Sequence, residues 1–401
     1  MIKIQLVPAG YGDTIIVSII AGVDNNDQTN LLIDCGFRYK RNILPRIKTL
    51  KKIDRFIITH YDSDHIYSAK KFIKENGAAA APHIISIAQV WLNTFRHLQE
   101  EKRLPMDEAT GQQLKEFVNS IPRVRSAGEE EEIGANQALL LGPELLRNKY
   151  PWNTDFAEKA VCVEHGPVVM VNDVKLTLLS PTKPALKKLE DEFIEELKKK
   201  NIVVSDSELL DDAFELFLQE GGSLSELGEK EAGKTTRLSP EKVLELSNGD
   251  NYNPDDASAN GSSIAFILEA QGKRLLFLAD AHAETIMESL AGHFTDKKQY
   301  PIFFDAVKVA HHGSFRNNNP ELIKMIDSPR FLFSTNGAHQ SKKHPDAETI
   351  ACIVNRPLSN GIEKRRLIFN HDLPHLHGFK DSALKTEFKY EFEVANDIEL
   401  E

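Results

Sequence analysis

Residues 59–65 read Thr-His-Tyr-Asp-Ser-Asp-His, a segment that places two imidazoles and two carboxylates side by side: His60, Asp62, Asp64 and His65. The apolar run Ile53–Ile58 before it predicts a buried strand, and the pattern from Ile66 onward predicts a helix. The four side chains are therefore expected on a short connection between a strand and a helix.

Carboxylates this close repel one another and raise each other's pKa values unless a cation lies between them. A mixed set of imidazoles and carboxylates suits Zn, Mn or Fe. The alternative is that Asp62, Ser63 or Asp64 caps the following helix without any metal. Four potential ligands at this spacing favour the metal site.

The chain has 401 residues, enough for one large domain with insertions or for two ordinary domains. Its composition is that of a globular protein, with 41% hydrophobic and 27% charged residues. The formal net charge of −11 argues against coating by nucleic acid through bulk electrostatics. A local basic groove and bound metal ions remain compatible with a nucleic-acid substrate.

The sequence predicts a cytoplasmic protein with no membrane contact. No signal-peptide pattern opens the chain, and no apolar run approaches the ~20 residues that span a bilayer. Cys35, Cys162 and Cys352 lie far apart and are odd in number, which indicates reduced thiols rather than disulfides or a cysteine-based zinc site.

Strand-like and helix-like segments alternate in three parts of the chain, about 1–97, 168–181 and 258–401. Between them, the segments about 98–167 and 182–257 are charged and helix-rich, and we interpret them as insertions. The pattern predicts an α+β fold, a four-layer α/β/β/α sandwich forming a single domain over residues 1–401. The acidic second insertion is typical of a solvated helical face, with a partner-binding or lid role as the alternative.

Two further motifs carry chemistry. Asp280 directly follows the apolar strand Leu275–Ala279, where it either faces a cleft or caps the next helix. His311 and His312 end another strand; if strand geometry continues, one imidazole enters the site and the other supports it from behind or caps a loop. A pair of surface histidines is the alternative interpretation.

Three more residues complete the candidate site. Gly313 would let the backbone come close to a ligand. His344 precedes a proline that we expect at an early helical position, and its imidazole is a candidate ligand or acid. Asp34 ends a strand from which it could orient a ligand histidine.

Together these motifs resemble the metallo-β-lactamase superfamily. Within it the chain is similar to the branch typified by the hydrolase domain of the ComEC competence DNA-uptake protein. The resemblance rests on Gly12-Asp13, the strand end Leu32–Gly36, the metal loop 60–65, Asn260-Gly261-Ser262, Asp280, and His311-His312-Gly313-Ser314. It implies the same sandwich fold and a metal-dependent hydrolase, and it leaves both insertions unexplained.

Two departures from the commoner superfamily pattern bear on the metal. Asp62 stands where the loop usually has its second histidine, and Asn260 replaces the usual histidine of the third motif. The first metal site is therefore richer in oxygen, which moves its preference from Zn towards Mn or Mg.

The resemblance implies two divalent metal ions about 3.5–4 Å apart, bridged by a carboxylate and a water. Zn or Mn is expected, with Mg as a further candidate. One ion is assigned mainly to His60 and Asp62, the other to Asp64 and His65, with Asp280 as the bridge.

His344, or one of the two histidines of the later motif, is expected to complete the second site. Asp64, His311 and His312 are the predicted catalytic residues, and one of His311 and His312 is expected to protonate the leaving group.

The favoured function is a phosphodiesterase or nuclease that acts on DNA or a nucleotide. The net charge favours short single strands, chain ends or small nucleotides over long duplexes. One alternative is hydrolysis of a carbonyl substrate such as a lactone or thioester, because this fold hosts both chemistries. The other is a metal-binding sensor or assembly subunit whose insertions dock a protein partner and gate the activity.

Overall fold

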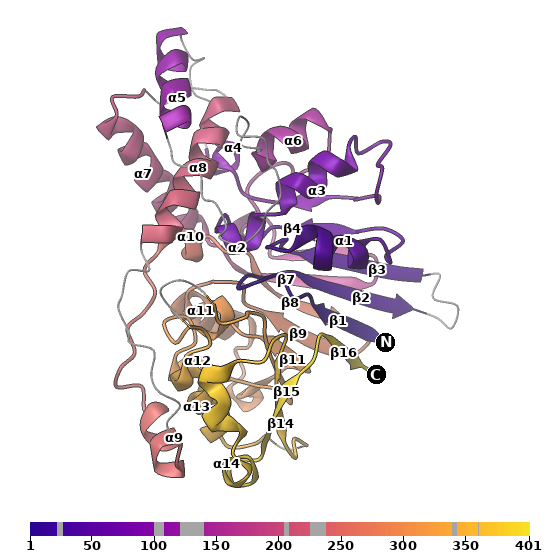
Figure 1. Ribbon diagram of the computed structural model, residues 1–401, viewed down its shortest axis with the longest axis vertical. Coiled ribbons are helices and arrows are strands. Elements are labelled where there is room, and N and C mark those ends of the chain that lie inside the picture. The colour runs from indigo at the N-terminus through magenta and orange to yellow at the C-terminus, as the bar shows by residue number, and fades with distance from the viewer. Residues whose placement is uncertain are drawn as a thin grey trace.

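Two β-sheets pack face to face in the computed structural model, with helices on both outer sides (Figure 1). The structure describes residues 1–21, 27–99, 108–120, 140–203, 208–224, 238–338, 343–359 and 361–401. Parts of both predicted insertions, residues 100–107, 121–139, 204–207 and 225–237, lie outside this description.

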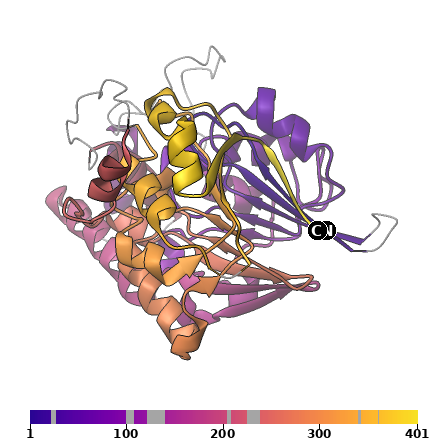
Figure 2. The same cartoon turned by 90° about the horizontal axis from the view of Figure 1, so that it is seen from below.

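The first sheet has six strands and joins the beginning of the chain to its end. In spatial order they are β16 (Asp397–Leu400), β1 (Ile2–Leu6), β2 (Ile15–Ala21), β3 (Asp27–Ile33), β4 (Arg55–Ile57) and β5 (Val90–Trp91). β1 and β16 pair antiparallel, with Ile2 opposite Leu400, so the two ends of the chain lie together (Figure 2).

The second sheet has eight strands. In spatial order they are β15 (Tyr390–Val394), β14 (Arg365–Phe369), β13 (Arg330–Phe333), β11 (Ala306–Lys308), β9 (Lys273–Phe277), β8 (Ala265–Ala270), β7 (Val174–Ser180) and β6 (Val168–Val171). A separate parallel pair is formed by β10 (Ile302–Phe303) and β12 (Ile326–Asp327). Strands β9, β11, β13 and β14 run parallel, so their carboxyl ends meet at one edge.

Alternation along the strands builds three apolar layers. Ile15 and Val17 of β2 point between the sheets, whereas Ile16 points to the outer face of the first sheet. On β9, Leu275 faces the first sheet and Leu276 faces the helices of the second. Burial on both faces explains why these strands read as nearly continuous apolar runs.

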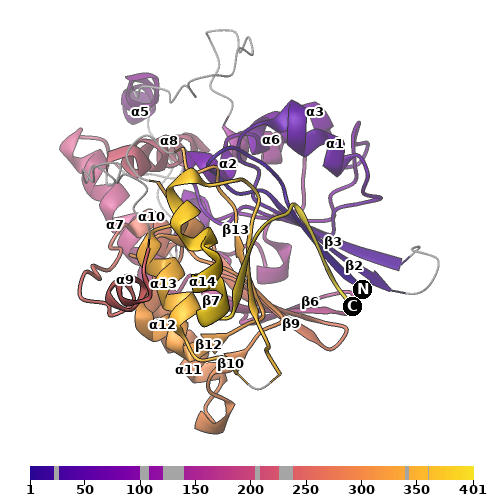
Figure 3. The ribbon, with the colours of Figure 1, turned by 60° about the horizontal axis from the view of Figure 1, so that its bottom comes forward.

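The helices divide between the two outer sides (Figure 3). The side of the first sheet carries α1 (Leu44–Ile47), α2 (Ser63–Ile66), α3 (Ala69–Asn76), α4 (Phe95–Leu98), α5 (Glu108–Ser120), α6 (Leu141–Arg147), α7 (Lys183–Lys199), α8 (Glu208–Leu224) and α10 (Ser258–Gly261). The side of the second sheet carries α9 (Pro240–Leu246), α11 (Ala283–His293), α12 (Pro320–Met325), α13 (Ala347–Asn355) and α14 (Ser382–Glu387). Short turns complete the chain: a π-turn at Tyr39–Ile43 and 3₁₀ turns at Thr154–Phe156, Val163–His165, Lys297–Gln299, His311–Gly313 and Pro374–Lys380.

The four-layer α/β/β/α architecture predicted from the sequence is confirmed. The boundaries of the two insertions stay a prediction. Their described helices are well packed: Phe193 of α7 and Phe214 of α8 are fully buried and contact Phe95 of α4, with ring centroids 4.9 and 5.7 Å away. The second predicted insertion therefore extends the apolar layer over the first sheet.

Candidate metal centre

The segment after β4 leads directly into the site. α2 begins at Ser63, so Asp64 and His65 lie on a short helix and not on the loop that the sequence predicted. Asp62 holds the N-cap position of α2, but its side chain makes no capping hydrogen bond and its buried Oδ1 has no hydrogen-bond partner. Helix capping therefore does not account for this carboxylate.

Asp280 comes from the other sheet, three residues after the end of β9, and is almost fully buried. It does not cap α11, whose N-cap residue is His282. Its Oδ2 lies 3.7 Å from His60 Nε2, and its Oδ1 lies 3.5 Å from His65 Nε2. The two oxygens of one carboxylate thus face two different imidazoles.

His311 and His312 both enter the site, because the strand geometry on which the prediction depended does not continue to them. β11 ends at Lys308, and both histidines have positive φ angles, 44° and 52°, inside a 3₁₀ turn. Because the strand has ended, its alternation no longer applies. His311 Nε2 lies 3.6 Å from Asp280 Oδ2, and His312 Nε2 lies 2.8 Å from Asp64 Oδ2.

These distances suggest different chemical roles for His311 and His312. Two ligand atoms at about 2.0–2.2 Å from one ion lie roughly 3–3.6 Å apart, close to the 3.5–3.7 Å separations that surround Asp280. His60 Nε2 and Asp62 Oδ2, 3.6 Å apart, and His65 Nε2 and Asp64 Oδ2, 3.7 Å apart, continue this spacing. The 2.8 Å contact of His312 is instead the length of a hydrogen bond.

Neighbouring side chains hold the ligand imidazoles with Nε2 turned inward. Asp34 accepts a hydrogen bond from His65 Nδ1 at 2.7 Å, which is the orienting position that the sequence suggested for it. The Thr59 hydroxyl donates to Asp34 at 2.8 Å, and Thr59 Oγ1 lies 3.1 Å from His60 Nδ1. Since the Thr59 hydroxyl donates its proton to Asp34, Oγ1 accepts from His60 Nδ1, and a neutral His60 ring then carries no proton on Nε2.

A buried ion pair stands behind His312. Lys308 Nζ lies 2.8 Å from Asp13 Oδ2, and Asp13 Oδ1 lies 3.5 Å from His312 Nδ1, which donates to the Ser334 carbonyl at 2.8 Å. Burial lowers the pKa of His312, but the carboxylates of Asp13 and Asp64 outweigh it and raise this pKa to about 9. These two carboxylates therefore favour the protonated form of His312.

The cluster fits a divalent metal. His60 Nε2, His65 Nε2 and Asp280 Oδ1 are buried without a hydrogen-bond partner, an arrangement that is costly unless a cation lies between them. Burial alone would raise the pKa of Asp280, yet His311, His65 and His60 hold it well below its usual range. Burial lowers the pKa of His65, and the surrounding carboxylates, Asp280 first, raise it well above its usual value. Both shifts show that the carboxylates of the site favour a positive charge beside them.

Tight packing against the metal loop depends on two glycines. A Cβ on Gly12 would lie 1.9 Å from the backbone oxygen of Asp64, and one on Gly36 would lie 2.4 Å from the same atom. The ligand approach that the sequence predicted for Gly313 stays a prediction. A Cβ there would lie 2.6 Å from Pro345 Cβ, so this glycine admits the chain beside His344.

His344 lies next to the site; like Asp62 and His311, it belongs to none of the described sets of donor atoms close enough together to share an ion. Its ring centroid is 5.3 Å from that of His311, and its Nδ1 is 3.7 Å from Asp346 Oδ2. Among the described residues, the sets of donor atoms close enough to share an ion draw on His60, His65, Asp280, Asp64, His312, Asp13 and Asp34. Pro345 precedes Asp346, the N-cap residue of α13, so it does not occupy the helical position that the sequence predicted. The ligand role of His344 stays a prediction.

Sequence reasoning missed Lys308, Asp255 and Asn317. All three are buried polar residues that contact the site: Lys308 through Asp13, and the other two at His311. The one available signal was a lysine inside the apolar strand before His311, since a buried charge requires a partner.

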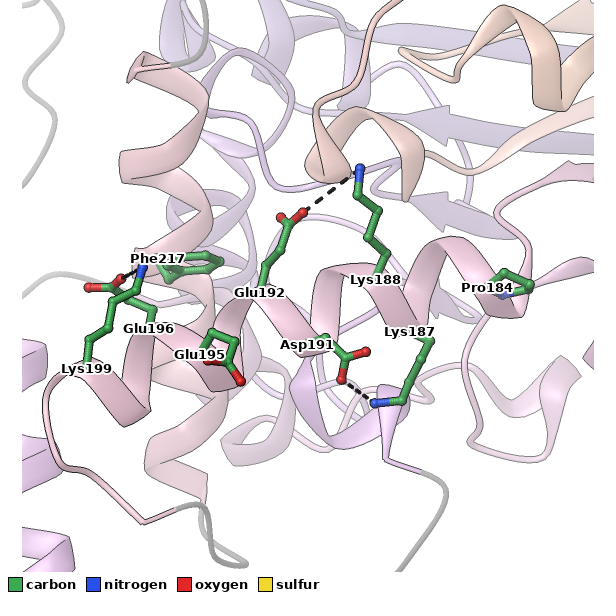
Figure 4. Close-up of a pocket in the computed structure, with 9 residues that line it drawn as sticks. All are labelled: Pro184, Lys187, Lys188, Asp191, Glu192, Glu195, Glu196, Lys199 and Phe217. Carbon is green, nitrogen blue, oxygen red and sulfur yellow. Dashed lines mark hydrogen bonds and ion pairs between the residues drawn. The ribbon is translucent and has the colours of Figure 1, made fainter.

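A groove of about 680 Å³ lies along α7 (Figure 4), where Lys188 donates to the backbone carbonyl of Asp256, the residue after Asp255. It is lined by Pro184, Lys187, Lys188, Asp191, Glu192, Glu195, Glu196, Lys199 and Phe217. Its lysines are neutralised by carboxylates on the same helix, such as Lys187 by Asp191 and Lys199 by Glu196. This groove therefore offers no cationic track for a phosphate backbone. In the part of the chain that the structure describes, no helix combines the length and apolar character that a membrane span requires.

No curated protein matches the chain. Similar solved structures include a point mutant of CmlA beta-hydroxylase, with 10% identity, a TM-score of 0.35 and coverage of 98% of this chain and 53% of the other. The chain thus spans about half the length of that protein. The metallo-beta-lactamase fold protein YhfI from Bacillus subtilis has 9% identity, a TM-score of 0.35 and full coverage of both chains. Zn(2+)-bound PqqB from Methylobacterium extorquens has 10% identity, a TM-score of 0.33 and coverage of 96% and 87%.

These structural similarities are too low to support an inference about this chain. The informative comparison is with family models: residues 13–139 match the model of the metallo-beta-lactamase superfamily. The matched segment includes the metal loop and Asp34, both of which reach the cluster described above. The chain therefore matches the metallo-beta-lactamase superfamily over about a third of its length, residues 13–139.

Proposed function

We propose that the protein is a metal-dependent phosphodiesterase acting on DNA or a nucleotide, in the manner expected of the ComEC-like branch. The observation that carries the proposal is the position of Asp280, whose two oxygens face His60 and His311 on one side and His65 on the other. A carboxylate so placed suits a bridge between two ions. The oxygen-rich donor set favours Mn or Mg beside Zn, and these ions commonly serve phosphoryl chemistry.

Each donor has an assignment in this proposal. His60, Asp62 and His311 would hold the first ion, Asp64 and His65 would hold the second, and Asp280 could serve both. When bound, two divalent ions activate a water as nucleophile and offset negative charge on a phosphoryl oxygen.

His312 supplies the proton. Its Nδ1 donates a hydrogen bond to the Ser334 carbonyl, and its Nε2 donates one to Asp64 Oδ2, at the edge of the candidate metal cluster. From there Nε2 can donate to the leaving oxygen as the ester bond breaks. This divides the work of the adjacent histidines, with His311 as ligand and His312 as acid.

A defined set of assays tests the proposal. Metal-free protein is loaded with Mn, Zn or Mg and assayed on bis(4-nitrophenyl) phosphate, single-stranded DNA, a lactone and a thioester. We expect metal-dependent cleavage of the two phosphodiesters, abolished by Asp64→Asn and retained by Asp173→Asn, a change at an exposed turn. Turnover of the lactone or thioester alone would overturn the substrate class, and absence of metal binding would overturn the whole proposal.

One contact favours a second candidate, a subunit with gated activity. Tyr61 lies between two proposed ligands and is buried against Phe214 of α8, with ring centroids 5.8 Å apart. A partner that displaced α8 would therefore disturb the metal loop. Full activity of the isolated monomer would argue against this candidate.

A further inference from the structure

His311 is held by a residue that no sequence motif marks. Asn317 is fully buried, and its Oδ1 lies 2.9 Å from His311 Nδ1. Its Nδ2 lies 2.9 Å from Asp255 Oδ2 and 3.0 Å from the Asp280 carbonyl oxygen, both of which only accept hydrogen bonds. The orientation of the amide is thereby fixed, so His311 Nδ1 donates and a neutral ring carries no proton on Nε2.

Asp255 in turn fixes the amide of Asn317. Its Oδ2 accepts from Asn317 at 2.9 Å and from Asn260 Nδ2 at 2.6 Å, and its Oδ1 accepts from the Ala257 N–H at 3.3 Å. Arg316 lies 3.8 Å from the same Oδ1. Because its oxygens are occupied in this way, Asp255 acts as an anchor for other side chains and not as a ligand.

The anchor comes from a distant part of the chain. Asp255 lies between α9 and α10, at the end of the segment 182–257 that we interpret as an insertion, and its backbone N–H donates to the Arg316 carbonyl at 3.2 Å. Asn260, which stands where the superfamily usually has a histidine, donates a hydrogen bond from its Nδ2 to this same carboxylate. The second insertion thus ends in a residue that supports the metal site.

We propose that Asp255 and Asn317 are positioning residues of the metal centre. Through a carboxylate–amide–imidazole chain they keep His311 Nε2 directed at the ion shared with His60 and Asp280. The inference rests on the proposed metal site and deepens it. Partners of ligand histidines typically change metal affinity 10- to 100-fold when removed.

Asn318 provides a matched control for Asn317. It is equally buried, but it bonds only backbone atoms, the N–H and carbonyl of Ala310 and the carbonyl of Ser314. In calorimetric titration of the metal-free protein with Mn²⁺, we expect Asn317→Ala to weaken the first site by about 10- to 100-fold. Asn318→Ala should lower the melting temperature and leave the Mn²⁺ affinity within about threefold.

A charge exchange tests the direction of the hydrogen bonds. Asn317→Asp alone places a second carboxylate against Asp255 and should weaken Mn²⁺ binding at least as much as Asn317→Ala. Adding Asp255→Asn restores a donor opposite the new acceptor and should recover part of that loss, because the Asp280 carbonyl still faces the new carboxylate without a donor. In ¹⁵N NMR of metal-free protein, the His311 ring should keep its proton on Nδ1 in the wild type and lose this preference in Asn317→Ala.

The outcomes separate this inference from the proposed function. If the wild type binds Mn²⁺ and Asn317→Ala binds it equally well, or if the exchange pair recovers nothing, the positioning role is wrong and the proposed function stands. If the wild type binds no divalent metal, the proposed function fails and this inference fails with it.

Discussion

The two histidines that follow β11 are adjacent in the chain but contact different carboxylates. His311 faces Asp280 at a spacing suited to shared ligation, and His312 faces Asp64 at hydrogen-bond distance. The difference arises from two successive residues with positive φ, a conformation that costs non-glycine residues energy and that often marks functional sites.

This geometry predicts that His312→Ala keeps both metal ions and loses turnover. General acid catalysis typically contributes 10²- to 10⁴-fold, so we expect kcat to fall by about that factor with metal content unchanged. His293→Ala, at the exposed end of α11, serves as the control. Metal analysis and single-turnover kinetics measure the two effects, and a His312→Ala protein with full turnover would remove the acid role.

A second prediction concerns the contact between Gly12 and Asp64. The Cβ in Gly12→Ala would overlap a backbone oxygen, which cannot rotate away, so we expect a loss of about 3 kcal/mol or more together with weakened metal binding. Gly292→Ala, in α11 with open space around its Cβ, should raise stability by about 0.5 kcal/mol. Chemical unfolding of both variants checks the contrast, which fails if the two behave alike.

At the residue scale, the sequence allowed prediction of those candidate site residues that lie close together in the chain or directly after a strand. The residues of the metal loop and Asp280 were recognisable because strand ends and paired carboxylates are visible in a short window. Asn317 and Asp255 were not, because they are 62 residues apart and ordinary in type. The turn at His311 and His312 was missed because the pattern of apolar residues in a strand does not indicate two successive residues with positive φ angles.

At the scale of elements, α4 shows how a short helix is fixed. Thr94 and His97 form a reciprocal cap, in which the Thr94 N–H donates to His97 Nδ1 at 3.1 Å. Burial, and then the nearby Arg96 charge, lower the pKa of His97 to about 3. The folded protein therefore keeps this ring neutral.

This pKa predicts an acid-sensitive contribution to stability. The unfolded chain protonates histidine near pH 6.5 and the folded chain only near 3. The contribution is therefore complete above about pH 6.5 and is lost as pH falls towards 3. His97→Gln retains a capping side chain without titrating, so at pH 5 the wild type should have lost about 2 kcal/mol more than the variant. Melting curves at pH 7.5 and 5.0 measure the difference, and parallel losses would contradict the argument.

Element types were easier to predict than their limits. The run Ile53–Ile58 is a strand only over Arg55–Ile57, the three residues that pair with β3, and β5 pairs with two of them. The helix expected from Ile66 is preceded by a separate turn of helix at Ser63. Strand and helix lengths depend on partners that lie elsewhere in the chain, and a local pattern does not contain them.

At the scale of the whole molecule, the metal centre lies where the two sheets meet. The ligands after β4 belong to the first sheet, and Asp280 and His311 follow strands of the second. An ion held by both sets would tie the two halves together. This arrangement follows from the stacking of the sheets, which the predicted fold class implied but individual motifs did not.

We therefore expect metal to stabilise the entire fold. A ligand at a hundredfold excess over its Kd contributes about 2.7 kcal/mol to the free energy of unfolding. Mn²⁺ should raise the melting temperature of the metal-free protein, and a chelator should reverse the rise. Asp280→Asn should abolish the effect, and Asp173→Asn should keep it. An equal rise in Asp280→Asn would place the stabilising ion elsewhere.

The pairing of β1 with β16 also sets an order of events during synthesis. Residues 2–5 take their places beside residues 397–400, so one edge of the first sheet stays bare until β16 has been made. At about 5–20 residues per second, the interval between the two strands is roughly 20–80 s. By then β2 can already pair with one edge of β1, while the other edge of β1 stays unpaired until β16 is made. Closure of this edge is thus a late event, which no partly synthesised chain that lacks β16 can complete.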